Sequence, residues 1–162
     1  MSLLIRKINR AKWPAEDVDY QSDVSADAIT NCLKTTRNTL SVWQIDTEDD
    51  LEKAVLAIAS NLQHLETIDV VILEEKHLSN YNIKIVATPG KTPLEELVHS
   101  HRDLEELTFM KLGTIKDHIV ERIQMDKFKR FTRTALKQLI EDAINTGKLK
   151  LEDLNPSIRE KI

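Results

Sequence analysis

The residues at the end of one apolar run are the chain's closest match to the active-site motif of a metal-dependent enzyme. The run "IDVVIL" (68–73) leads into Glu74 and Lys76. A Glu-x-Lys pair at the end of a strand, joined by an earlier acid, can hold a Mg²⁺ ion on a phosphate group and position the attacking water. Asp46 or Asp69 would supply the second carboxylate. These four residues define one hypothesis, a magnesium-dependent nuclease, although the residue inside the pair is acidic where a strand would favour an apolar one.

A Gly-Lys-Thr triplet at residues 90–92 raises the question of a nucleotide-binding loop. The phosphate-binding motif G-x-x-x-x-G-K-[ST] would need a glycine at position 85, but Ile85 lies within a strand-like run. Pro89 and Gly90 suit the two central positions of a type II turn, and Thr92 suits the cap of a following helix. The sequence therefore predicts a turn and a helix here, not a nucleotide site.

Two histidines follow within the helix predicted from Thr92, in the stretch "HSHRDLEEL" (99–107). His99 and His101 are two residues apart, so on a helix they lie on different faces and cannot share a metal ion. His101 falls in the apolar stripe, which predicts a partly buried packing residue. The single cysteine, Cys32, excludes an internal disulfide and is expected to be buried and inert. We expect no metal site and no cofactor.

Charge is distributed unevenly along a chain whose formal net charge is −4. Residues 1–12 carry four bases and no acid, residues 126–150 carry seven bases and three acids, and residues 13–125 carry ten bases and 21 acids. This pattern indicates either a footprint for an acidic partner or neutralisation of the acidic middle by the two ends in the folded chain. On a helix predicted over 126–146, a basic stretch (127–137) could contact nucleic-acid phosphates. Its bases are Lys127, Lys129, Arg130, Arg133 and Lys137.

Four strands and five main helices should position these side chains. Strands are predicted at 3–8, 40–45, 68–73 and 83–88. Helices are predicted to begin near Ser25, Thr47, Thr92 and Thr114, followed by the one over 126–146. A long helix joins the second and third strands, which favours parallel neighbours, whereas the short link between the third and fourth favours antiparallel pairing.

The fold class expected from this order is α/β or α+β. It has a mixed sheet of about four strands packed by helices, and a helical C-terminal region. Residues 1–112 would form the core, and residues 113–162 would pack on the same domain. The apolar residues of the C-terminal segment, Leu149, Leu151, Leu154 and Ile158, must pack on that body or on a partner. Trp13 and Pro14 are expected to anchor a polar loop over about 15–23.

The composition is typical of a folded protein, with 41% hydrophobic and 31% charged residues. No apolar run is long enough to span a bilayer, and a single cysteine suits a reducing compartment, so we expect a cytoplasmic protein with no membrane contact. We expect the residues that resemble catalytic or binding motifs to begin helices, close turns or fill the interior instead.

The leading interpretation is a non-catalytic accessory or adaptor protein that acts by protein–protein interaction. A nuclease, a nucleic-acid binder and a homo-oligomer are its alternatives. Ionisable groups crowded around one water-accessible hollow would count against a non-catalytic role.

Overall fold

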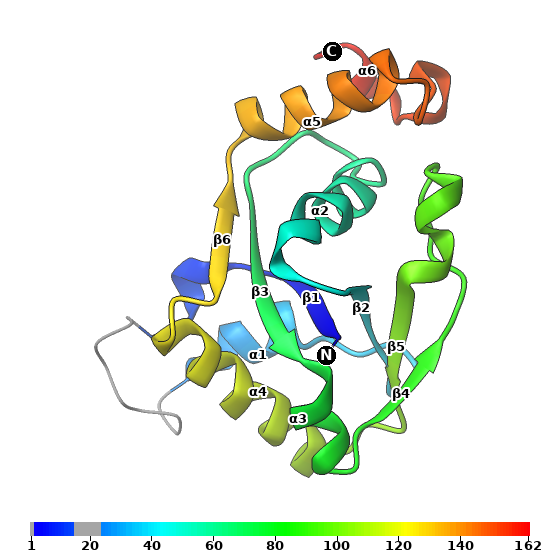
Figure 1. Cartoon of the computed structure of the whole chain (residues 1–162). Coiled ribbons are helices and arrows are strands. Elements are labelled where there is room, and N and C mark those ends of the chain that lie inside the picture. Colours follow the sequence, from blue (N-terminus) through cyan, green and yellow to red (C-terminus); the bar gives the residue numbers. More distant parts are fainter. Residues whose placement is uncertain (1, 15–23) are drawn as a thin grey trace.

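A six-stranded sheet forms the centre of the protein in the computed structural model, which describes residues 2–14 and 24–162. The strands are β1 (Leu3–Ile8), β2 (Leu40–Ile45), β3 (Ile68–Glu74), β4 (Lys84–Ala87), β5 (His101–Glu105) and β6 (Phe128–Phe131). Their order across the sheet is β4-β5-β2-β1-β3-β6, and each neighbouring pair is antiparallel (Figure 1). The polar loop expected at 15–23 lies outside the described residues.

The α+β class is confirmed, but the strand count and pairing differ from the prediction. β2 and β3 do run in the same direction, yet they are not neighbours, because β1 lies between them and pairs with both. Leu4 and Ile5 of β1 are fully buried on opposite faces, which is what a central strand requires. The predicted pairing of 68–73 with 83–88 is wrong, because β4 lies at the far edge and pairs with β5.

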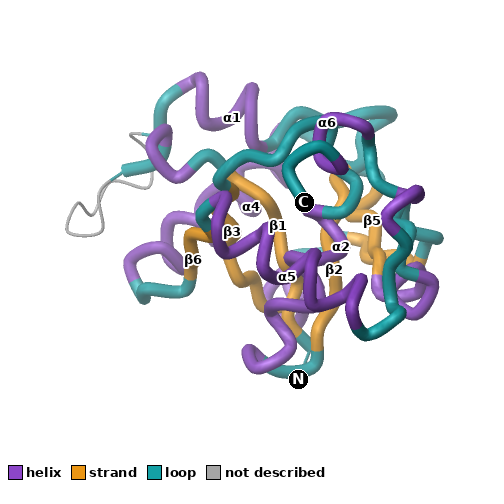
Figure 2. Tube along the Cα trace, turned by 90° about the horizontal axis from the view of Figure 1, so that it is seen from above, coloured by secondary structure: helices purple, strands orange, loops and turns teal. Residues whose placement is uncertain are grey.

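Helices cover the two faces of the sheet separately. One face packs against α2 (Leu51–Ala59), α5 (Arg133–Asn145) and the C-terminal turn α6 (Pro156–Arg159). The other face packs against α1 (Ala26–Cys32), α3 (Glu75–Asn80) and α4 (Phe109–Gln124). Seen from above in Figure 2, the strands lie beneath α5 and the C-terminal turn.

Short 3-10 helices make several connections between these elements. They are η1 (Arg10–Lys12), η3 (Glu48–Asp50), η4 (Glu95–Ser100) and η5 (Leu151–Asp153). Of these, η4 matters most for the site described below, because it precedes β5 and packs beside α2. No helix within residues 2–14 and 24–162 has the length and apolar character needed to cross a membrane.

Two of the predicted helices contain a strand instead. The helix expected from Thr92 is replaced by η4 and by β5, which adds to the edge of β2. The helix expected over 126–146 is β6 followed by α5, and Thr132 caps α5 by accepting the N–H of Ala135. Phe128 and Phe131, read as one helical stripe, point to opposite faces of the sheet. Two apolar residues three positions apart can occur in a helix or in a strand. Here the segment is a strand because it pairs with the open edge of β3.

The C-terminal segment packs on the body of the protein, as one of the two predicted alternatives requires. Leu149, Leu154 and Ile158 are almost completely buried against α2 and α5, whereas Leu151 is 43% exposed. Gly147 follows α5 with a φ of 75°, the left-handed conformation that a glycine adopts readily after the end of a helix. The segment therefore completes the core on the α5 face.

Candidate functional site

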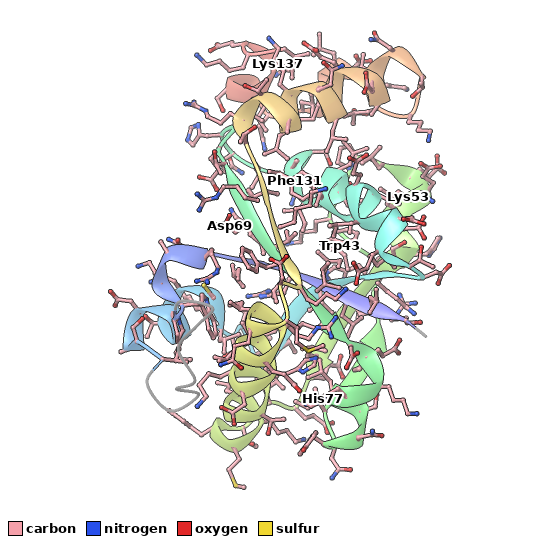
Figure 3. The ribbon with its side chains drawn as sticks, turned by 60° about the vertical axis from the view of Figure 1, so that its left-hand side comes forward. Trp43, Lys53, Asp69, His77, Phe131 and Lys137 are labelled. Atoms are coloured by element: carbon pink, nitrogen blue, oxygen red, sulfur yellow. The ribbon has the colours of Figure 1, made fainter. Side chains whose placement is uncertain are left out.

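A surface groove forms where the C-terminal end of β2, the first turns of α2 and η4 meet. Its cavity volume is about 500 Å³. Buried apolar side chains make its floor, namely Trp43, Ile45, Ala54, Ala57 and Leu97. Polar and ionisable residues make its rim, namely Gln44, Asp46, Asp50, Lys53, Glu96, His99, Ser100, Arg102 and Lys148. We call this feature the Trp43 groove; Trp43 and Lys53 are labelled in Figure 3.

Gly90 supports the floor of the groove from the loop before η4. A Cβ atom at this position would lie 2.8 Å from Trp43 Cζ3 and 2.8 Å from His101 Cβ, and closer still to Trp43 Cη2. The Gly90 N–H donates to the carbonyl of Val98 at 2.9 Å, which closes the loop. Gly90 does not have a positive φ, so the predicted type II turn is wrong. The glycine is required by close approach to an indole ring.

His101 packs edge-on against Trp43, with ring centroids 5.1 Å apart. The Thr88 hydroxyl donates to the Asp103 carboxylate at 3.0 Å and therefore accepts from His101 Nδ1 at 2.8 Å. Burial lowers the pKa of His101, so the ring is held neutral with its proton on Nδ1. The prediction of a partly buried packing histidine is confirmed, although the residue lies on a strand and not on a helix.

The rim of the groove gathers ionisable groups, as a catalytic centre would, but its Asp50–Lys53 pair favours the charged form of both residues. Lys53 Nζ lies 2.7 Å from Asp50 Oδ1. That hydrogen bond lowers the pKa of Asp50 and raises the pKa of Lys53. Lys148 lies 3.9 Å from Glu96, a looser pair. A general acid needs a carboxyl pKa raised by burial, and a basic lysine needs a lowered one. The Asp50–Lys53 pair is shifted in the opposite directions.

A second cluster joins Glu74, His77 and His118, whose potential ligand atoms lie within 4.8 Å of one another. Two observations argue against a metal ion there. Buried His118 accepts the Glu74 N–H at Nε2 (3.0 Å) and donates from Nδ1 to Glu121 (3.1 Å), so both ring nitrogens are occupied. The rings of His77 and His118 are stacked 3.9 Å apart at 11°. An imidazole binds a metal in its ring plane, and near-parallel planes cannot share one ion. The cluster is a structural junction between α4 and β3.

Of the two acids that could complete the nuclease site, Asp69 lies apart from Glu74 and Lys76. Glu74 ends β3 and lies 3.3 Å from Arg122, while Lys76 is exposed on α3. Asp69 lies toward the other end of β3 and binds Arg130 at 2.7 Å (Figure 3 shows Asp69 far from His77). Burial would raise the pKa of Asp69, but hydrogen bonds from Arg130 and from a backbone N–H lower it overall. Asp46 belongs to the rim of the Trp43 groove.

The five predicted nucleic-acid-binding residues are not on one helix. Lys127 precedes β6, Lys129 and Arg130 are exposed on β6, and Arg133 and Lys137 belong to α5. β1 and β6 pair with opposite edges of β3, so the two basic ends of the sequence lie on either side of this strand.

Several bases at these ends are paired with acids of the middle region. Lys7 lies 2.6 Å from Glu66, and Lys127 lies 2.6 Å from Glu48. Arg130 is bound to Asp69, as described above. Neutralisation within the fold is therefore one real effect of the charge pattern. Cys32 is buried, as predicted, and its Sγ accepts N–H groups from Asn9 and Trp13.

The groove could not be located from the sequence, and only Asp46 among its rim residues was a candidate. Its parts come from 43–57, 96–102 and Lys148, and only tertiary packing brings them together. The available sequence signal was Gly90, in the Pro-Gly-Lys loop. A glycine is needed there because the loop lies close to the Trp43 ring. Comparisons with protein-family models, with curated proteins and with solved structures gave no match to this chain.

Proposed function

We propose that this chain is a cytoplasmic, non-catalytic accessory protein that binds a short segment of a partner protein in the Trp43 groove. The observation that carries the proposal is the combination of a buried apolar floor with an exposed rim of oppositely charged side chains. The cavity volume of about 500 Å³ lies within the range of pockets that bind small ligands, so the groove can hold a short peptide segment. Cys32, the single cysteine, is buried as a reduced thiol, which suits a reducing compartment.

The chemistry of the groove favours a peptide with one apolar side chain. Trp43, Ala54 and Ala57 offer an indole ring and two small side chains, so an aliphatic or aromatic residue can be buried on this floor. Around the floor, Lys53 supplies a positive charge and Glu96 a negative charge. Both face the peptide backbone on either side of the buried side chain. Such a rim excludes water from the apolar contact, and it orients the bound peptide more than it raises the binding affinity.

The same geometry supports binding over acid–base catalysis. The Lys53–Asp50 ion pair holds both groups charged, and neither acquires the pKa that proton transfer near neutral pH requires. His101, the neutral histidine beside the floor, is occupied in positioning Trp43 through its ring contact.

Selection from a random-peptide library on the immobilised protein tests this proposal. Peptides that bind the unaltered chain are re-measured against Ser100→Trp, which fills the groove, and against Ser79→Trp, a matched control on exposed α3. We expect binding to be lost with the first variant and retained with the second. Peptides enriched for one apolar residue with flanking charges would support the proposal. Equal binding to both variants, or no selected peptide at all, would refute it.

A further inference from the structure

A second hollow lies at the beginning of α5, on residues separate from the Trp43 groove. Its cavity volume is about 490 Å³, and it is lined by Leu65, Arg133, Thr134, Lys137 and Lys161. Three of the five lining residues are cations, and none is an acid. Lys137 is labelled on α5 in Figure 3, well apart from Trp43 and Lys53.

The three cations keep hydrogen-bond donors available. Arg133 donates from Nε to the carbonyl of Leu65 at 3.0 Å, which fixes the guanidinium at the hollow and leaves its terminal nitrogens without an ion pair among the described residues. Lys137 lies 3.7 Å from Glu141, a loose pair one helical turn away with both side chains partly exposed. Lys161 makes no ion pair with any described residue. By contrast, Arg130 is held on Asp69 through two nitrogens.

Like charges gathered around one hollow repel each other unless an anion lies between them. No carboxylate lines the hollow to relieve that repulsion within the described residues. Arg133 and Thr134 are also the first two residues of a 13-residue helix, so the positive end of the α5 dipole adds to the same potential. An anion with several acceptor oxygens is the ligand that satisfies these donors.

The positive surface continues from the hollow along the sheet. Lys129 of β6 pairs in register with Val70 and lies on the same face as the hollow's helix, whereas Lys7, on the other side of Val70, is paired with Glu66. Lys129 rests over the Phe131 ring at 5.1 Å and makes no ion pair with a described residue. An unpaired cation beyond the anion site favours an extended polyanion over an isolated anion.

We propose that the hollow binds one phosphate group of a single-stranded nucleic acid, and that Lys129 on β6 contacts the backbone further along the strand. Arg133 contacts the phosphate bidentately, and Lys137 and Lys161 close around it as point charges. The interaction is independent of sequence, because no base-stacking aromatic residue lines the hollow. This site is separate from the peptide groove, so either could exist without the other.

Binding of a fluorescent single-stranded oligonucleotide, measured by anisotropy over a series of salt concentrations, tests the proposal. The test variant is Arg133→Gln with Lys137→Gln and Lys161→Gln. The matched control neutralises three exposed cations elsewhere, through Arg37→Gln, Lys34→Gln and Lys91→Gln. Loss of the single phosphate site in the hollow should reduce the slope of log affinity against log salt by about 0.7 and weaken binding at least tenfold, whereas the control should bind as the unaltered chain does.

Two further arms keep the test decisive. Because Arg133 also supports Leu65, the pair Lys137→Gln and Lys161→Gln is measured too, and its slope should fall by no more than about 0.7 with folding unchanged. Inorganic phosphate and a single nucleotide are titrated in parallel. If they bind as tightly as the oligonucleotide, the strand is not the ligand and the proposal fails. Equal affinities for the test and control variants would also overturn it.

Discussion

Gly90→Ala tests whether the packing of this glycine against Trp43 defines the floor of the groove. The new methyl carbon would lie 2.8 Å from both Trp43 Cζ3 and His101 Cβ, and closer to Trp43 Cη2. Trp43 is 8% exposed and borders the groove, so a ring displaced by this methyl group would move into the groove and change its floor. Overpacking of this kind costs about 1–3 kcal/mol, so the free energy of unfolding should fall by that amount. For a chain of this length, the melting temperature should fall by roughly 2–12 °C.

Gly113→Ala is the matched control, because a Cβ there meets nothing within 4 Å. Gly113 lies inside α4, where alanine is favoured over glycine by about 0.5–1 kcal/mol. Urea unfolding followed by tryptophan fluorescence should therefore show opposite changes for two identical substitutions. If Gly90→Ala is as stable as the unaltered chain, the close approach to Trp43 is not real. If it is unstable but binds groove peptides normally, the link between this packing and the site is refuted.

Other predictions concern the histidine junction and the nuclease hypothesis. Burial lowers the pKa of His118 below its ordinary value of 6.5, so the unfolded chain takes up this proton first and the free energy of unfolding should fall as pH drops through about 6.5. His118→Gln can still accept the Glu74 N–H and should flatten this pH dependence, whereas His118→Ala leaves that donor unpaired and should cost about 1–3 kcal/mol; unfolding curves between pH 5 and 8 measure both, and unchanged curves would contradict the assigned hydrogen bonds. Because Glu74 is paired with Arg122, Asp69 is paired with Arg130 and Asp46 lies on the rim of the Trp43 groove, incubation of DNA or RNA with Mg²⁺ or Mn²⁺ should give no cleavage; cleavage that Glu74→Ala abolishes would establish the nuclease.

The elements that the sequence predicted well are those with strong local signals. β1, β2 and β3 are rich in branched apolar residues and lie within one residue of their expected bounds. Ser25 caps α1 by accepting the Ala28 N–H, at the predicted start of that helix, and α5 ends just before Gly147, at the predicted end of the last long helix. In each case neighbouring residues carry the information.

The errors come from contacts that no local pattern encodes. β5 contains one buried apolar residue, Leu104, and is a strand because Leu40 and Ile85 lie on either side of it. β6 has aromatic residues spaced for a helix, and the free edge of β3 makes it a strand. The groove depends on both kinds of contact, since β5 and η4 stand where one helix was expected. Candidate site residues chosen by motif were consequently scattered over the fold.

The central claim is that a peptide is bound on the floor of the Trp43 groove. NMR spectra of the protein with labelled alanine methyl groups, recorded as a selected peptide is added, test it most directly. We predict that the Ala54 and Ala57 methyl signals shift in proportion to binding, while the signal of exposed Ala135 on α5 remains unchanged. Shifts at Ala135 without shifts at Ala54 and Ala57 would contradict the account.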